Sequence, residues 1–392
     1  MEKRDSYALT QNRIRPFRMR LTGRRLPFFA LLVLLRFATP LLSQPAPGDT
    51  DPAPEPKKKS SLRVAVLPIL SYRPETRWNF GAGGVINFRL GHTKEQTRPS
   101  SLWLRFIYTQ NKQLFIRVSP ELYLPKNQFV LNFNLSYVRF PTDFYGIGNG
   151  VSFSNSEEYT PRIFRFEVVL NKRILPHLYA GLGYYLDKTT MESITPGGLL
   201  ASGAIAGSTG GLVSGLGIHA SWDTRDNVIY PHQGIMFSLI SYLYSSAFGS
   251  KYNYTMLALD FRYYTPVVSS HVFAFQAYFK SLGGNAPFYN LAQLGGSNTM
   301  RGYFQGFYRD RTLTLCQAEY RLPVWWRFGV VAFAGVGEVS SGLDDFHLHN
   351  LKYALGTGIR FKLDKREGTN LRLDWAWGEG QHAFYLAIQE SF

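Results

Sequence analysis

Apolar and polar residues alternate in short stretches that follow one another from residue 62 to residue 392. The stretch 371–378 (LRLDWAWG) shows the pattern: two leucines and two tryptophans share one parity, and Arg372 and Asp374 share the other. The stretch 351–363 alternates in the same way. The last segment places these residues on one face: Phe384, Leu386, Ile388 and Phe392. Period two is the period of a β-strand. The sequence therefore predicts an all-β chain with one continuously apolar face.

Sixteen such stretches can be counted. They are 62–72, 77–90, 101–110, 113–124, 128–140, 160–172, 177–188, 213–223, 234–246, 252–265, 271–283, 311–322, 326–337, 351–363, 369–378 and 382–392. The long connections are 141–159, 189–212, 284–310 and 338–350. All four follow odd-numbered strands, so they lie at the same end of an antiparallel barrel, as the long extracellular loops of outer-membrane barrels do. Pro68 and Pro120 interrupt the ladder, and Pro68 is expected to weaken the pairing of the first strand with the last.

Residues 1–43 have the organisation of a secretory signal peptide. A basic segment precedes ten apolar residues, 26–35, which are too few to cross a bilayer as a helix of about 20 residues. The segment holds nine basic and two acidic residues, so seven of the net charge of +16 belong to it. Residues 44–60 are rich in proline and small polar residues, which predicts a disordered periplasmic tether. The barrel domain would then occupy residues 61–392.

The composition and the signal peptide together favour a membrane location for the sheet. Charged residues make up 18% of the chain and aromatic residues 16%, whereas soluble proteins average about 25% charged residues. Backbone groups in lipid must all be paired, which requires a closed barrel. The sequence therefore predicts a transmembrane antiparallel β-barrel of about sixteen strands, with aromatic residues on the lipid-facing wall and at its interfaces. A soluble β-sandwich, whose apolar face would meet a second sheet, is the alternative.

No catalytic or cofactor-binding motif is found in the sequence. There is no G-x-S-x-G, no H-E-x-x-H and no phosphate-binding loop, so neither an enzyme nor a cofactor is expected. The single cysteine, Cys316, excludes a disulfide scaffold. His347 and His349 lie near two aspartates, but isolated loop histidines are usually solvated, and no metal site is expected. Nucleic-acid binding is not expected of a secreted barrel.

Three further stretches stand out as motifs. The turn after the eighth strand contains Asp223, Arg225, Asp226, Asn227, Pro231 and Gly234. Its acidic and amide side chains can accept bonds from nearby backbone amides, so a structural turn explains it. The loop after the eleventh strand contains Gly295, Gly296, Arg301, Gly302 and Tyr303. The closing pair of strands ends on Phe392, which we interpret as a C-terminal strand signal.

These stretches, together with the loop 144–149 (FYGIGN), resemble the BamA/TamA family of outer-membrane barrels, the bacterial surface-antigen superfamily. The resemblance implies that the loop after the eleventh strand folds inward and that Arg301 pairs with a carboxylate of the inner wall. The parity of the fifteenth strand points Asp374 inward, and Glu338 is a second candidate at the top of the thirteenth strand. Relatives carry an acidic residue in the segment 333–337 (FAGVG), which has none here, so both candidates remain open.

The resemblance also implies a function at the bacterial outer membrane. The family inserts or translocates outer-membrane proteins or moves lipid, through a seam between the first and last strands that opens laterally. The expected partners are outer-membrane lipids, the barrel assembly machinery for the chain's own insertion, and client outer-membrane proteins. The seventeen-residue tether is too short for the family's periplasmic modules, which places substrate capture in doubt and favours lipid handling or an accessory role. The alternatives are a passive channel or structural surface protein and, more remotely, a lipid hydrolase.

Overall fold

The structure is a computed structural model that describes residues 63–88, 90, 97–268, 270–363 and 368–392. The predicted signal peptide and the predicted tether lie outside the described residues. None of the helices among the described residues is long and apolar enough to cross a membrane.

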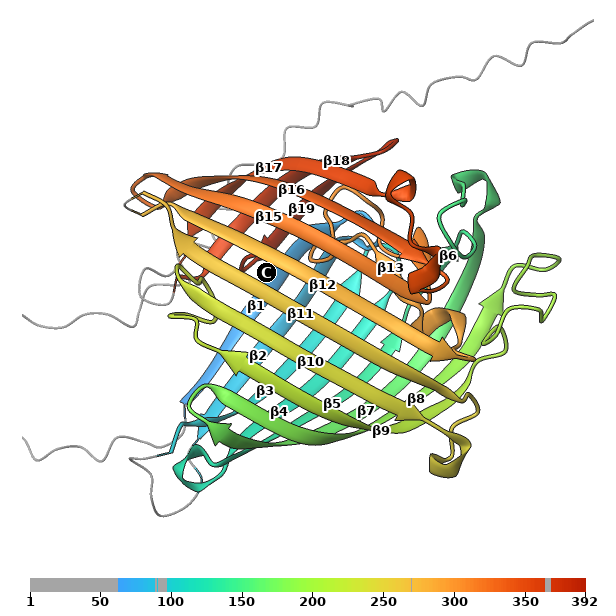
Figure 1. The fold of residues 1–392 in the computed structure, drawn as a ribbon, viewed down its shortest axis with the longest axis horizontal. Helices are drawn as coiled ribbons and strands as arrows, with labels where there is room; N and C mark the ends of the chain where they lie inside the picture. The colour runs from blue at the N-terminus through green and yellow to red at the C-terminus, as the bar shows by residue number, and fades with distance from the viewer. Residues whose placement is uncertain (1–62, 89, 91–96, 269, 364–367) are drawn as a thin grey trace, which may run out of the picture. The chain divides into compact units, whose positions relative to one another are not determined.

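Sixteen antiparallel strands form the wall of a closed barrel (Figure 1). They are β1 (Arg63–Arg73), β2 (Arg77–Phe88), β3 (Ser100–Thr109), β4 (Leu114–Tyr123), β5 (Phe129–Arg139), β7 (Glu157–Leu175), β8 (Leu178–Ile194), β9 (Gly211–Asp223), β10 (Gly234–Tyr244), β11 (Tyr254–Pro266), β12 (Val272–Gly284), β15 (Thr312–Trp325), β16 (Phe328–Ser340), β17 (Lys352–Lys362), β18 (Asn370–Gly378) and β19 (Gln381–Ile388). Each wall strand pairs with the next along the chain. The predicted all-β barrel is confirmed, and each predicted strand overlaps one wall strand.

Short elements occur in the connections between wall strands, most of them at the end of the barrel that carries the long connections. The three-residue strand β6 (Thr142–Phe144) extends the sheet beside β7, and β13 (Ala292–Leu294) pairs with β14 (Tyr308–Asp310) as a separate hairpin. Six 3-10 turns complete the described elements: η1 (Pro125–Asn127), η2 (Phe153–Asn155), η3 (Ser246–Phe248), η4 (Phe288–Asn290), η5 (Leu343–Asp345) and η6 (Leu348–Asn350). The β13–β14 hairpin lies in the connection from β12 to β15, which folds into the barrel.

The two faces of β18 follow the alternation of its sequence. Trp375 and Trp377 are each 50% exposed on the outer surface, whereas Arg372 and Asp374 are buried inside. An apolar exterior and a polar interior are the arrangement that a bilayer stabilises. The outer face is therefore the one suited to lipid, and the inner face meets the lumen and the inward loop.

The chain end departs from the alternation. The strand β19 stops at Ile388, and Gln389 takes a left-handed backbone conformation with φ of 73°. Phe392 is therefore buried beside Tyr264 and Ala274 instead of facing outward with Phe384, and the prediction that it ends the apolar face of the last strand is wrong. A single left-handed residue rotates the chain out of the ladder, and no alternation of side chains records this.

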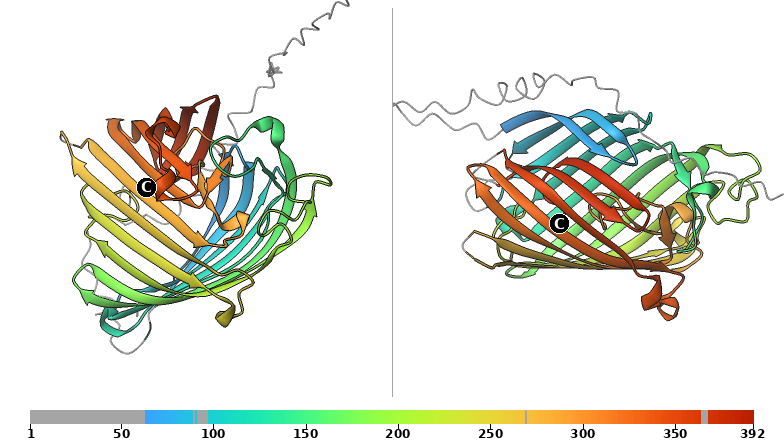
Figure 2. Two further views of the ribbon diagram at one scale, coloured as in Figure 1. Left: turned by 45° about the vertical axis from the view of Figure 1, so that its right-hand side comes forward. Right: turned by 90° about the horizontal axis from the view of Figure 1, so that it is seen from above.

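The seam between β1 and β19 has much less pairing than the rest of the wall. Only Tyr72 and Leu386 are in register across it, whereas β1 pairs with β2 along its whole length, from Arg63 to Arg73. On the outer surface, the rings of Tyr72 and Phe384 lie 5.7 Å apart. Figure 2 shows the first strands (blue) and the last strands (dark red) meeting here. Most of the β1 edge thus lacks a strand partner on the β19 side.

The two prolines occupy weak points of the ladder. Pro68 lies in β1 opposite Ala82 of β2, in the part of β1 that has no register partner in β19. Pro120 lies in β4, where the pairing with β5 stops at Val118 and resumes at Glu121. Both positions agree with the inability of proline to donate a ladder hydrogen bond.

Candidate functional site

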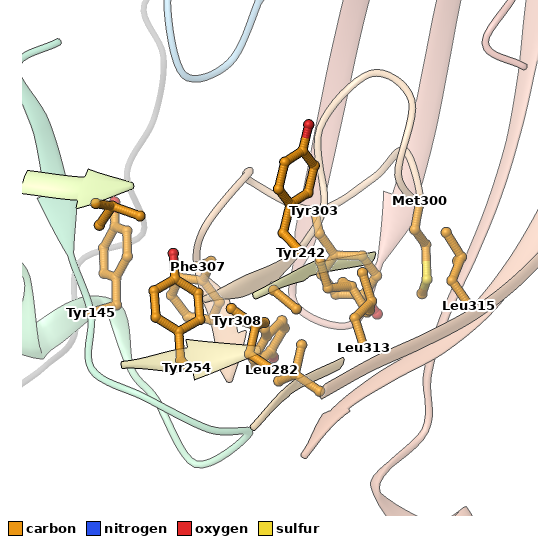
Figure 3. Close-up of a cluster of buried hydrophobic side chains, with 14 of the residues drawn as sticks. Tyr145, Tyr242, Tyr254, Leu282, Met300, Tyr303, Phe307, Tyr308, Leu313 and Leu315 are labelled. Carbon is orange, nitrogen blue, oxygen red and sulfur yellow. The ribbon is translucent and has the colours of Figure 1, made fainter. Parts of the chain in front are cut away.

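The connection between β12 and β15 turns sharply so that its tip enters the barrel. Gly302 has φ of +112°, and a Cβ atom at this position would lie 3.0 Å from the backbone carbon of Trp377 in β18. Only glycine accepts both the conformation and the close approach without strain. Met300, Tyr303, Phe307 and Tyr308 of this loop share one buried apolar cluster with wall side chains, including Leu282, Leu313 and Leu315 (Figure 3). This packing fixes the loop against the inner wall.

Arg301 lies at the tip of the loop, and its side chain is 1% exposed. One guanidinium nitrogen donates to Asp374 Oδ2 at 2.6 Å, and another donates to Glu319 Oε1. The guanidinium carbon lies 3.5 Å from the ring centroid of Phe333 in β16, which adds a cation–π contact. A charge buried this deeply is tolerated only when it is paired and hydrogen-bonded.

The two carboxylates that hold Arg301 are themselves held by other arginines. Glu319 accepts from Arg321 at 3.0 Å, and Asp374 accepts from Arg360 and, at 3.5 Å, from Arg372. The chain end joins this network, because Glu390 pairs with Arg360 at 2.7 Å and Arg321 donates to the Phe392 oxygen at 2.9 Å. The ion network therefore links the inward loop, β15, β17, β18 and the residues after β19.

Of the two candidate partners of Arg301, Asp374 contacts it and Glu338 does not. Glu338 lies near the top of β16, where it accepts from the Asn149 side chain at 3.4 Å and from the backbone of His347. The proposed pairing of Arg301 with Glu338 is thus wrong, because the loop tip reaches deeper than the end of β16. The sequence reasoning missed Glu319, although its alternation with Tyr320 places it on the polar face of its strand.

Tyr303 anchors the loop to the last strands. Its hydroxyl donates to the Tyr353 carbonyl oxygen at 2.7 Å and accepts from the Glu379 amide at 2.9 Å. Its ring lies against Gly378, where an added Cβ atom would approach the ring to 2.5 Å. The Gly302 amide adds a bond to the Tyr385 hydroxyl at 3.2 Å. The motif that contains Arg301 is therefore a docking segment for β17, β18 and β19.

The same loop bridges the seam. The Phe304 amide donates to the Gln381 side chain of β19 at 3.0 Å, and the Gln305 amide donates to Glu75 Oε1 at 2.7 Å. Glu75 lies in the turn between β1 and β2, on the other side of the seam, and its second carboxylate oxygen has no hydrogen-bond partner among the described residues. Two neighbouring amides of the loop thus hold the two edges of the seam together.

The turn motif is a structural turn that is held largely by hydrogen bonds among its own residues. The Asp223 carboxylate accepts hydrogen bonds from two guanidinium nitrogens of Arg225, at 2.9 and 2.7 Å. The Oδ1 atom of Asn227 accepts hydrogen bonds from the Ile229 and Tyr230 amides. Burial opposes ionisation of Asp226, but the amides of His232 and Gln233 hold the pKa of its carboxyl below its usual range. Two residues complete the turn: buried Pro231 and Gly234, which has φ of +112°.

The FYGIGN loop packs on the inward loop from the side of β5 to β7. The ring of Phe144 lies 5.2 Å from that of Phe288, and the Gly148 amide donates to the Arg309 carbonyl oxygen at 2.8 Å. Asn149 donates to the Val339 carbonyl oxygen at 2.6 Å. This second loop therefore fixes the outer part of the inward loop.

A model of the Omp85 superfamily domain matches residues 80–392. The chain belongs to the Omp85 superfamily. The match covers the barrel from β2 to the chain end, including both the turn motif and the inward loop, and it agrees with the expected resemblance to BamA/TamA-type barrels. The protein is accordingly a barrel of the bacterial outer membrane. A comparison with curated proteins gave no match.

Solved structures of Omp85 proteins share the fold. BamA from Haemophilus ducreyi lacking POTRA domains 1–3 superposes with a TM-score of 0.58 at 12% identity, over 85% of this chain and 71% of that one. CdiB from Acinetobacter baumannii gives 0.57 at 12% identity, over 84% and 60%. CdiB from Escherichia coli gives 0.55 at 9% identity, over 85% and 64%. The chain thus spans less than two thirds of either CdiB protein.

No group of three or more histidine, cysteine, aspartate or glutamate side chains that could hold a metal ion occurs in the part of the chain that the structure describes. The rings of His347 and His349 stack 5.3 Å apart in the exposed connection after β16, and His347 lies 3.8 Å from Asp345.

The seam contact at Glu75 should depend on pH. Burial raises the pKa of the Glu75 carboxyl, although the Gln305 amide partly opposes the shift. When the pKa of a group is higher in the folded than in the unfolded protein, the contribution of that group to stability is complete below its unfolded-state pKa. The contribution is lost as the pH rises through the folded-state pKa. Wild-type protein should therefore unfold at a lower temperature at pH 8 than at pH 5. Glu75→Gln, which keeps the acceptor oxygen without the charge, should reduce that difference.

The measurement is heat-modifiability on gels at both pH values, with Glu121→Gln in β4 as a matched control. Glu121 faces the lumen far from the seam and accepts from Tyr123. An unchanged pH difference in Glu75→Gln would contradict the assignment.

Proposed function

We propose that this Omp85 barrel assists the insertion or translocation of outer-membrane proteins, or the handling of lipid, through lateral opening of the seam between β1 and β19. The observation that carries the proposal is the single register pair across the seam. Each other boundary between consecutive wall strands has at least eight register pairs, so the wall separates most easily here. An exposed strand edge is a template for pairing with another chain, which is what an inserting strand needs.

The inward loop supports this proposal because it can control the seam. Its Phe304 amide bonds to the β19 side of the seam, and its Gln305 amide bonds to the β1 side. Arg301 fixes the loop to Asp374 of β18. Breaking the hydrogen bond between Gln305 and Glu75 would free the β1 side of the seam from the loop and leave the ion network intact. Hydrogen bonds of this kind contribute about 1 kcal/mol each, so opening is energetically accessible.

A passive channel is the second candidate. The lumen contains a cavity of about 420 Å³ beside the inward loop, and a solute could use such a space without any motion of the wall. The two functions differ in whether the seam must open.

Cross-linking of the seam distinguishes them. Cysteines replace Tyr72 and Leu386, whose Cα atoms are in register, in a Cys316→Ser background, and mild oxidation or a short disulfide-containing cross-linker joins them. We expect loss of the chain's contribution to outer-membrane protein assembly or lipid asymmetry, with recovery after reduction. A matched pair at Ala82 and Phe106 joins β2 to β3 on the outer face and should leave function intact. Full function with a locked seam would refute the proposal and favour the channel.

A further inference from the structure

A row of arginines crosses the inner wall on the side away from the ion network of Arg301. Arg105 of β3 is in register with Arg117 of β4, and the row continues through Ser136 to Arg165 and Asp187. Leu104 and Phe106, on either side of Arg105, are 40% and 51% exposed on the outer face, so Arg105 faces the lumen. Register partners in an antiparallel pair share a face, which places Arg117 there too.

The pairing of Arg105 with Arg117 opposes folding unless an anion joins it. Like charges directly opposite each other destabilise a sheet. Arg165 is neutralised by Asp187 at 2.7 Å. Neither Arg105 nor Arg117 forms an ion pair with a carboxylate among the described residues, and both are exposed to the lumen. Two adjacent guanidinium groups thus remain without a carboxylate at ion-pair distance among the described residues, although Glu167 acts on Arg117 from further away.

A cavity lies at the end of this row of arginines. The space of about 420 Å³ is lined by Arg165 and Glu167 on one side and by Lys280 of β12 on the other. The Lys280 ammonium donates to the Asn290 carbonyl oxygen at 3.2 Å, and no carboxylate in the described ranges pairs with it. Figure 2 shows β3 and β4 (cyan) in the wall that faces β12 (light orange) across the lumen. Lys280 therefore shares this space with Arg165 and Glu167, and the row of arginines reaches the edge of the space through Arg165.

Aromatic rings line the same region, although the sequence suggested that aromatic residues would face lipid. Trp103 has the parity of Arg105 and is 43% exposed, with the Arg105 guanidinium 5.9 Å from its ring centroid. Six tyrosines line the cavity: Tyr185, Tyr242, Tyr244, Tyr254, Tyr278 and Tyr289. Phenol groups supply hydrogen-bond donors beside flat apolar faces. The lining suits a ligand that carries a charged group on a polar organic body.

We propose that the lumen binds a phosphate-bearing ligand through Arg105, Arg117 and Lys280. Phosphate is favoured because the planar guanidinium fork matches its oxygens, and because its charge exceeds one at neutral pH. The source is either the headgroup of an anionic lipid or a soluble phosphate compound, and the shared chemistry is the phosphate group. The site lies in the lumen wall and does not depend on opening of the seam.

Titration calorimetry on the full-length chain in detergent tests this inference. The probes are dihexanoyl phosphatidic acid below its micellar concentration and inorganic tripolyphosphate, with dihexanoyl phosphatidylcholine as the net-neutral comparison. We expect binding of at least one anionic probe, weakening as salt rises. Binding of only the lipid would identify a headgroup site, and binding of only tripolyphosphate a soluble ligand. Failure of both anionic probes to bind would overturn the proposal.

Charge-neutral variants localise the site. Arg105→Gln with Arg117→Gln should weaken binding at least tenfold while leaving the heat-modifiability temperature unchanged or higher, since the repulsion is removed. Lys112→Gln with Lys126→Gln removes the same charge from exposed turns and should bind like wild type. If the arginine variant does not fold, Lys280→Gln carries the test with an expected loss of at least threefold. Equal affinity in the lumen and control variants would refute the site, and the seam proposal would be unaffected.

Discussion

Arg301→Ala should destabilise the folded barrel by roughly 3–5 kcal/mol, the cost of breaking a buried ion pair from one side. The substitution removes the cation between Glu319 and Asp374, both of which are fully buried, and it removes the contact with Phe333. Heat-modifiability on gels should shift to a markedly lower temperature, and activity at the outer membrane should fall with it. Arg301→Lys keeps the charge but not the fork that reaches two carboxylates, so an intermediate loss is expected.

The matched control is Arg311→Ala, at the far end of the same loop. Arg311 is exposed, and its backbone accepts from the Leu282 amide, which the substitution preserves. It should change the unfolding temperature little. If Arg301→Ala keeps wild-type heat-modifiability and full function, the loop does not depend on its arginine and the inward anchoring described above is incorrect.

Gly378→Val should detach the loop by a different route. Its Cβ atom would approach the Tyr303 ring to 2.5 Å, and that ring is held by hydrogen bonds to Tyr353 and Glu379 that must break for it to move. Overpacking of this kind costs roughly 1–3 kcal/mol, and the lost hydrogen bonds add to the cost. The unfolding temperature should fall, and the Gly302 and Phe304 amides should exchange faster.

A double-mutant cycle with Tyr303→Ala tests the cause. If the clash with the ring is responsible, Gly378→Val should cost little once the ring is absent, giving a coupling of roughly 0.5–3 kcal/mol. Gly342→Val is the control, because no atom lies within 4 Å of a Cβ atom built at that glycine. Strictly additive losses would show that valine acts on the strand itself and not through Tyr303.

The wall was predictable because its information is local. Alternation of side chains sets the period and the face of each strand, and this was enough to place Asp374 inside and Trp375 outside. The glycines around Arg301 likewise signal a sharp loop. Glu319 was not selected because its role depends on how deep the loop tip reaches, which no single strand encodes.

The register between strands and the turn of the chain at Gln389 could not be predicted from the sequence. A slip of two residues preserves every inward and outward assignment, so alternation cannot reveal that Tyr72 meets Leu386 or that the remaining β1 edge is unpaired. Phe392 has the parity of Phe384 and is therefore expected to face outward, whereas the left-handed Gln389 ends the ladder before it. The lumen row of Arg105 and Arg117 also needs register, because the two residues come from different strands.

The proposed opening of the seam between β1 and β19 in the membrane can be measured directly. Spin labels on cysteines at positions 72 and 386, in a Cys316→Ser background, measure the separation of the two strands in liposomes by pulsed electron paramagnetic resonance. Labels at positions 82 and 106 report on a fully paired boundary in the same wall. If the seam opens, we expect a short and a long distance for the seam pair and only a short distance for the wall pair. A single short distance of equal width for both pairs would contradict it.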